Sequence, residues 1–174
     1  MSSIFGELGT LLLQLLAVPV ALGIALALRY LLARQIALWS FRLRHARTGR
    51  DLLIVYSESP HWQTYVEREW LPRLGGRAVV LNWSKRSQWS RWTPEVMLFR
   101  AFTGLREFNP VAIVVPRRWG GPTVIRFWRA FRDFKHGKAQ TLRQGERELD
   151  VALAANQPRA PRDGAVGRRP GAHA

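Results

Sequence analysis

The longest apolar stretch of the chain lies near its N-terminus. Residues 11–28 read LLLQLLAVPVALGIALAL and contain no charged side chain and one polar side chain, Gln14. A bilayer core about 30 Å thick is crossed by roughly 20 apolar residues at about 1.5 Å per residue. Extending the stretch to Ala33 supplies that length. The pattern therefore predicts a transmembrane helix over residues 11–33.

The charges around this helix predict that it is retained and how it is oriented. A secretory signal peptide begins with basic residues, whereas residues 1–10 contain none and carry Glu7. Six arginines follow the apolar stretch, between Arg29 and Arg50, and basic residues beside a span are held on the cytoplasmic side. The sequence thus predicts a single-pass anchor in the cell (inner or plasma) membrane, with residues 1–10 outside and the remainder cytoplasmic.

Two other interpretations of the apolar stretch are open. The tripeptide Ala25-Leu26-Ala27 imitates a cleavage site, so a removed signal is one alternative. A buried core helix is the other, although the rest of the chain is too small to surround a helix that is apolar on every face. Beyond the span, residues 34–50 predict a basic juxtamembrane helix or linker, helical to about Arg47, with Trp39 near the headgroups.

Short apolar runs separated by amphipathic segments predict an α/β domain over residues 51–156. Apolar runs bounded by turn residues indicate buried strands, and apolar positions three and four apart indicate helices. The expected strands are 52–56, 78–81 and 111–115, and the expected helices are 61–74, 93–104, 124–135 and 141–154. Strands that alternate with helices predict a small three-layer domain around a short, mainly parallel sheet of about three strands, in the order βαβαβα.

The C-terminal residues differ in composition from this domain. Residues 157–174 are mostly Pro, Gly, Ala and Arg, and Val166 is their one large apolar side chain. Such a segment buries too little apolar surface to fold, so a disordered basic tail is predicted.

The charge balance of the chain favours an anionic partner. With 27 Lys and Arg against 12 Asp and Glu, the net charge is +15, and the excess is spread along the whole chain. For a protein held in a bilayer, the acidic lipid headgroups are the simplest such partner. Nucleic acid is disfavoured because the sequence carries no recognised reader motif. The absence of cysteine excludes disulfides, and the four histidines have no metal-ligand spacing, so no metal or cofactor is predicted.

Loops that follow parallel strands meet at one edge of a sheet, and ligands bind there. In this sequence those loops are 57–62, 82–86 and 116–121. Their basic side chains, tryptophans and glycines suit a small anionic ligand. The ligand-binding candidates are Ser57, Asn82, Lys85, Arg86, Arg117, Arg118, Gly120 and Gly121, and the candidates for acid–base catalysis are Glu58 and His61. The alternative interpretation is a solvated or lipid-facing basic edge.

No catalytic motif in the sequence names a reaction. The predicted function is therefore a membrane-anchored module whose basic domain binds an anionic ligand, an acidic lipid surface or a partner protein, a second copy included. The alternative is a membrane-tethered transferase or hydrolase that acts on a phosphorylated or nucleotide-linked substrate at the C-terminal edge of the sheet.

Overall fold

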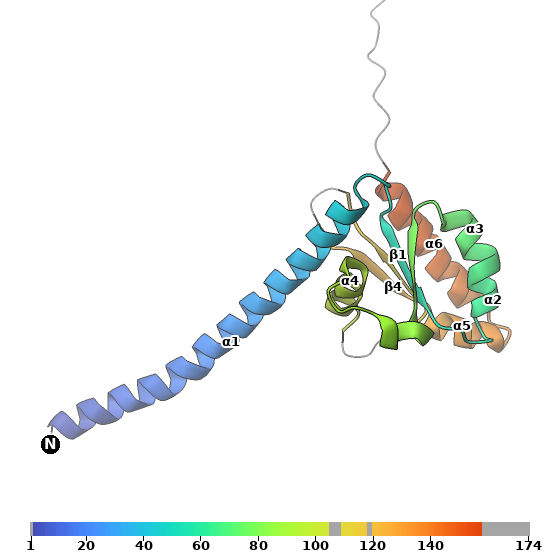
Figure 1. Cartoon of the computed structure of the whole chain (residues 1–174). Coiled ribbons are helices and arrows are strands. Elements are labelled where there is room, and N and C mark those ends of the chain that lie inside the picture. The colour runs from blue at the N-terminus through green and yellow to red at the C-terminus, as the bar shows by residue number, and fades with distance from the viewer. Residues whose placement is uncertain (1, 105–108, 118–119, 158–174) are drawn as a thin grey trace, which may run out of the picture.

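The computed structural model describes residues 2–104, 109–117 and 120–157, with residues 2–14 and Leu16 described by their backbone alone. It is a mixed α/β structure with two visible parts (Figure 1). A long helix, α1, forms the N-terminal part. A four-stranded sheet covered by helices on both faces forms the rest. Of the predicted tail 157–174, only Gln157 lies within the described residues.

Helix α1 is continuous from Ser2 to His45. Its 44 residues extend over about 66 Å, and it includes both the predicted span 11–33 and most of the predicted juxtamembrane segment. The stretch Ala17–His45 is long and apolar enough to cross a membrane, and no residue of its most apolar part is buried. Because none of these residues is buried, the apolar part of α1 is not a core helix of the described chain.

The sheet has the strand order β2-β1-β3-β4. Its strands are β1 (Leu52–Tyr56), β2 (Ala78–Asn82), β3 (Val111–Val114) and β4 (Thr123–Arg126). Strands β1 and β2 are parallel, with Leu52 opposite Ala78. Strands β1 and β3 are antiparallel, with Leu52 opposite Val114, and β3 and β4 are also antiparallel. The predicted mainly parallel sheet of about three strands, in the order βαβαβα, therefore differs from the structure in strand number, in strand order and in the direction of β3.

Strand β3 runs antiparallel to β1, and not parallel as predicted, because two segments instead of one connect it to β2. The first is the 3₁₀ helix η2 (Trp83–Gln88) with the residues that follow it, and the second is α4 (Pro94–Thr103). Helix α4 begins beside the end of α1, since Glu95 contacts His45. It finishes beside the other end of the sheet, where the Thr103 carbonyl accepts a hydrogen bond from Arg126. The chain therefore re-enters the sheet where β1 ends, and Val111 pairs with Val55.

Strand β4 replaces the first part of the predicted helix 124–135. Thr123, Val124 and Ile125 are β-branched, and such side chains lose rotamer freedom in a helix and pack well in a sheet. Ile125 is buried in the core on one face of the sheet, and Val124 packs, partly buried, against the core on the other face. Helix α5 begins only at Trp128 and ends at Lys135.

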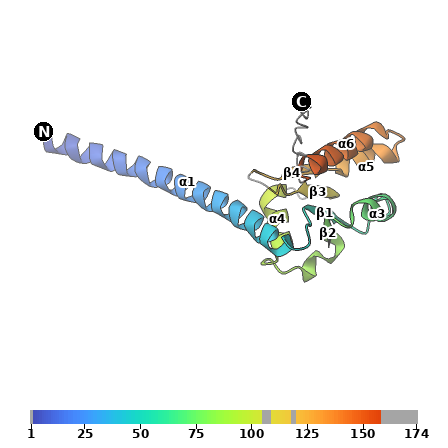
Figure 2. The same cartoon turned by 90° about the horizontal axis from the view of Figure 1, so that it is seen from above.

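Helices pack on both faces of the sheet, and all five residues of β1 are buried. One face is covered by α2 (Gln63–Tyr65), the π-helical turn η1 (Val66–Trp70), α3 (Leu71–Leu74), α5 and α6 (Gln140–Ala155). Trp70 lies at the centre of this layer, with its ring centroid 4.5 Å from that of Phe127. The other face is covered by α4 and the end of α1, through Leu38, Phe41 and Phe99. Figure 2 shows these layers from above.

Candidate functional site

The antiparallel direction of β3 divides the predicted site between the two ends of the sheet. The loops after β1 and β2 share one end, because these strands are parallel. The residues after β3 lie at the opposite end, beside Asp51, which precedes β1. One end holds Ser57, Glu58, Asn82, Lys85 and Arg86, the other holds Arg117, Gly120 and Gly121, and Arg118 lies outside the described residues. The expectation of a single shared edge is thus wrong for the third loop.

At the first end, Glu58 links the two loops. Its Oε1 accepts a hydrogen bond from Nδ2 of Asn82 at 2.7 Å and lies 3.9 Å from Nζ of Lys85. Its backbone N–H donates to Oγ of Ser84, and the neighbouring Ser57 accepts from the indole of Trp62. These contacts hold the two loops together through the backbone N–H and one carboxylate oxygen of Glu58.

The other acid–base candidate, His61, does not join this group. The centroid of its ring lies 6.3 Å from that of the Trp62 ring. His61 lines a small cleft together with residues of α5. Arg86 also turns back onto its own segment, because its guanidinium lies 5.1 Å from the ring of Trp83.

At the opposite end, Asp51 joins four parts of the domain. Only 4% of this residue is exposed. Its two oxygens accept hydrogen bonds from Arg77 at 2.9 and 2.6 Å, from Asn156 at 2.8 Å and from Arg117 at 3.4 Å. Arg77 also donates to the carbonyl of Leu153 in α6. Sequence reasoning missed Asp51; its signal is a lone carboxylate directly before a wholly apolar strand.

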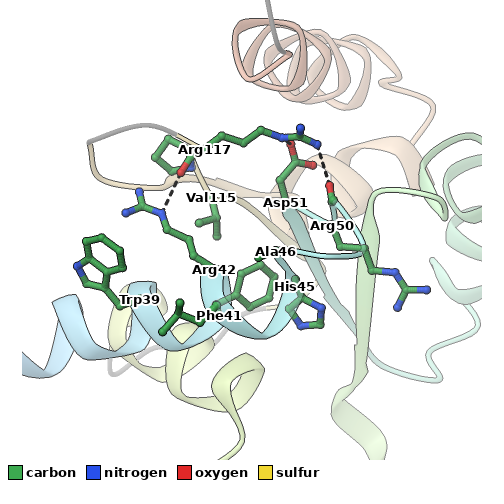
Figure 3. Close-up of a pocket in the computed structure, with 12 residues that line it drawn as sticks. Trp39, Phe41, Arg42, His45, Ala46, Arg50, Asp51, Val115 and Arg117 are labelled. Carbon is green, nitrogen blue, oxygen red and sulfur yellow. Dashed lines mark hydrogen bonds and ion pairs between the residues drawn. The ribbon is translucent and has the colours of Figure 1, made fainter.

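A cavity of about 330 Å³ lies next to Asp51, between the end of α1 and the residues that follow β3 (Figure 3). Nε of Arg42 donates to the carbonyl of Pro116 at 3.0 Å, and its Nη2 donates to that of Gly120 at 3.3 Å. Nη2 of Arg117 donates to the carbonyl of Gly49 at 2.9 Å. Both guanidinium groups therefore face protein oxygens. This arrangement fastens the β3–β4 connection onto α1, and the predicted residues Arg117 and Gly120 contribute to that attachment.

Helix α4 is docked along the last turns of α1. Nε2 of His45 lies 2.6 Å from Oε1 of Glu95, and Nε of the neighbouring Arg44 lies 3.1 Å from the same oxygen. At the other end of the contact, the guanidinium of Arg34 lies 4.3 Å from the ring of Phe102. The domain therefore meets α1 from Arg34 onward, directly after the predicted span 11–33.

Three arginines gather around the C-terminal end of α4, and we call them the α4-end arginines: Arg34, Arg100 and Arg126. They come from α1, α4 and β4. Nη2 of Arg126 donates to the carbonyl of Thr103 at 2.8 Å, and Arg100 and Arg126 are exposed. Cations are favoured at a helix C-terminus because the last carbonyls carry partial negative charge. Because Arg100 and Arg126 are exposed, guanidinium donors of these residues can face an anionic surface.

Two tyrosines on the face of the sheet that α5 and α6 cover have strongly shifted pKa values. The Tyr65 hydroxyl donates to Oε1 of Glu146 at 2.9 Å, and the Tyr56 hydroxyl donates to Oε1 of Glu67 at 3.1 Å. Burial, together with the adjacent carboxylates, raises the pKa of each tyrosine to about 12. Both hydroxyls remain protonated at neutral pH and serve as structural hydrogen-bond donors.

Within residues 15–104, 109–117 and 120–157, no three His, Asp or Glu side chains gather in a way that could hold a metal ion. A comparison of the chain with protein-family models, curated proteins and solved structures finds no match.

Proposed function

We propose that this protein is a membrane-anchored module that holds its basic α/β domain against the acidic lipid headgroups beside its own anchor. The observation that carries the proposal is the contact between Arg34 and Phe102. It brings the domain to the first turn of α1 that follows the predicted span.

The dimensions of α1 limit how far the domain extends from the membrane on this side. From Arg34 to His45 the helix rises about 17 Å, and α4 packs beside this stretch. The headgroup region adds about 5–7 Å to each side of the hydrocarbon core. The C-terminal end of α4 would then lie at headgroup level, and its N-terminal end about two helical turns farther out.

The charge at this level fits the proposed surface. The α4-end arginines surround the turn that is nearest the membrane. A guanidinium group pairs well with phosphate oxygens, and each basic residue near an acidic leaflet contributes about 1 kcal/mol to binding. Because the arginines of α1 follow the apolar stretch, we also propose that the domain is cytoplasmic.

The proposal is tested with the full chain in nanodiscs of phosphatidylcholine or phosphatidylglycerol. Since the chain has no cysteine, a nitroxide can be attached through Ala101→Cys, next to Arg100, and separately through Val151→Cys on α6. We expect the label at position 101 to be shielded from a water-soluble paramagnetic relaxant in phosphatidylglycerol more than in phosphatidylcholine. The label at position 151, where the side chain is 69% exposed, should respond equally in both lipids.

A matched pair of variants separates a local contact from general charge. Arg100→Gln should reduce the lipid-dependent shielding, whereas Arg143→Gln, at an exposed position of α6, should leave it unchanged. Equal shielding in both lipids, or an equal effect of the two variants, would overturn the proposed lipid contact.

A further inference from the structure

A second basic surface lies on the side of the domain away from the apolar half of α1. It is a cleft of about 220 Å³ between the residues after β1 and helix α5. In Figure 1, α2 and α5 lie far from the N-terminal part of α1, and Figure 2 shows the same for α5. None of the α4-end arginines lines this cleft.

The cleft has aromatic walls that are held in place by the fold. Phe131 is 1% exposed, and its ring centroid lies 6.3 Å from that of Trp62. The indole N–H of Trp62 donates to the carbonyl of Ser57 at 3.2 Å, which fixes the ring. Trp128 also lines the cleft, with the guanidinium of Arg132 5.0 Å from its ring. The walls are thus suited to a planar group.

Four basic side chains line the same cleft, His61, Arg132, Lys135 and His136, and no carboxylate lines it. In the part of the chain that the structure describes, the side chains of His61, Lys135 and His136 make no hydrogen bond or ion pair. Arg132 has one weak ion pair, at 4.0 Å to Asp133, and is 53% exposed. Basic side chains from two segments that are distant in sequence therefore line one cleft, and within the described residues their one ion pair is the weak contact of Arg132 with Asp133, which favours an anion between them.

We propose that this cleft binds a small anion that carries one planar ring, namely an aryl or heterocyclic monophosphate. The ring would lie against Trp62 and Trp128 over Phe131, and the phosphate oxygens would accept hydrogen bonds from Arg132 and Lys135. The volume of about 220 Å³ is below the roughly 300–1,000 Å³ of drug-sized sites. It is suited to a single ring with its phosphate.

The probe is phenyl phosphate, titrated calorimetrically into the full chain in phosphatidylcholine nanodiscs. Neutral lipid keeps the result independent of the acidic-headgroup contact proposed above. We expect saturable binding of phenyl phosphate and weaker binding of both phenol and inorganic phosphate, because each lacks one half of the recognised chemistry. Inorganic phosphate that binds as tightly as phenyl phosphate would overturn the role of the aromatic walls, and no saturable binding of phenyl phosphate would overturn the site.

Two double variants with equal charge loss test the location. Arg132→Gln with Lys135→Gln should weaken phenyl phosphate binding by about tenfold or more, since it removes both charged donors. Lys138→Gln with Arg143→Gln, outside the cleft, should change it by less than about twofold. If the first pair unfolds the domain, His136→Asn at the exposed rim replaces it, with a weakening of about twofold or more expected. An equal loss in the control, or unchanged affinity in the cleft variant, would contradict the proposal.

Discussion

Nε2 of His45, the last residue of α1, lies 2.6 Å from Oε1 of Glu95 in the first turn of α4. Both residues are buried, with 8% and 5% of their surface exposed. The second oxygen of Glu95 has no hydrogen-bond partner within the described residues. This pair joins α1 to the rest of the domain through a polar contact inside an otherwise apolar packing layer.

His45→Ala should destabilise the domain, because it leaves the buried Glu95 carboxylate with only Arg44 as a partner. A loss of about 1–3 kcal/mol in the free energy of unfolding is expected. Chemical denaturation in detergent micelles, followed by near-ultraviolet circular dichroism, measures it. Arg44→Ala is the control, since the Arg44 side chain is 59% exposed and its loss should cost less than about 1 kcal/mol. Equal effects of the two variants would show that His45 has no special role.

Asp51→Asn should be among the most damaging single substitutions outside the apolar core. It removes the charge that faces Arg77 and Arg117 at the junction of four elements. Breaking a buried ion pair costs about 3–5 kcal/mol, and we expect about 3 kcal/mol because Arg77 is 27% exposed.

Asp150→Asn is the matched comparison for Asp51→Asn. Its partner Arg73 and Asp150 itself are 46% and 50% exposed, so a change of less than about 1 kcal/mol is expected. The same denaturation series measures both variants. If Asp150→Asn proved the more harmful, the central position of Asp51 would be refuted.

Gly145→Ala should destabilise the protein even though alanine is the better helix former. In most helices this change gains about 1 kcal/mol. Here the new Cβ would lie 2.8 Å from a ring carbon of Phe127, which is fully buried against Trp70. Such overpacking costs about 1–3 kcal/mol, so a net decrease in thermal stability is expected. Gly76→Ala, where nothing lies within 4 Å of the new atom, should be neutral or slightly stabilising.

The shifted tyrosines predict a loss of stability at alkaline pH. Their pKa of about 12 in the folded chain exceeds the value of about 10 in an unfolded chain. Stability from these groups is therefore complete below about pH 10 and is lost as the pH rises toward about 12. Tyrosinate absorbance of the folded chain should show two of its three tyrosines titrating near pH 12, and Tyr56→Phe and Tyr65→Phe should each remove one. Normal titration of both in a domain that keeps its native circular dichroism would contradict this.

The sequence predicts local elements well where one pattern dominates. The run LLIVY gives β1, and the spacing within residues 141–154 gives α6, because in each case periodicity and propensity agree. At residues 123–127 they disagree: the aromatic spacing continues the pattern of α5 backward, while the β-branched residues form β4. The strand forms because β3 offers it an antiparallel partner, which local spacing does not reveal.

The candidate site depended on strand direction, which is a long-range property. Glu58 and Asn82 could be placed together because β1 and β2 are joined by a single crossover. Arg117 could not, because the position of β3 depends on how α4 packs against α1, through contacts such as that between Arg34 and Phe102. The Asp51–Arg77 pair also depends on tertiary structure, since its partners come from separate loops.

Cysteine scanning of α1 in native membranes tests the proposed membrane anchor most directly. Leu15, Leu22, Leu28 and Leu43 are 70%, 59%, 61% and 72% exposed in the folded chain, so protein packing alone would leave all four open to a membrane-impermeant maleimide. Anchoring by residues 11–33 predicts that Leu15→Cys, Leu22→Cys and Leu28→Cys react only after detergent denaturation. Leu43→Cys should react once the maleimide has access to the side of the membrane on which residue 43 lies. Ready labelling at position 22 in intact membranes, or recovery of a chain that lacks the first part of α1, would contradict the anchor and with it the proposed position of the domain.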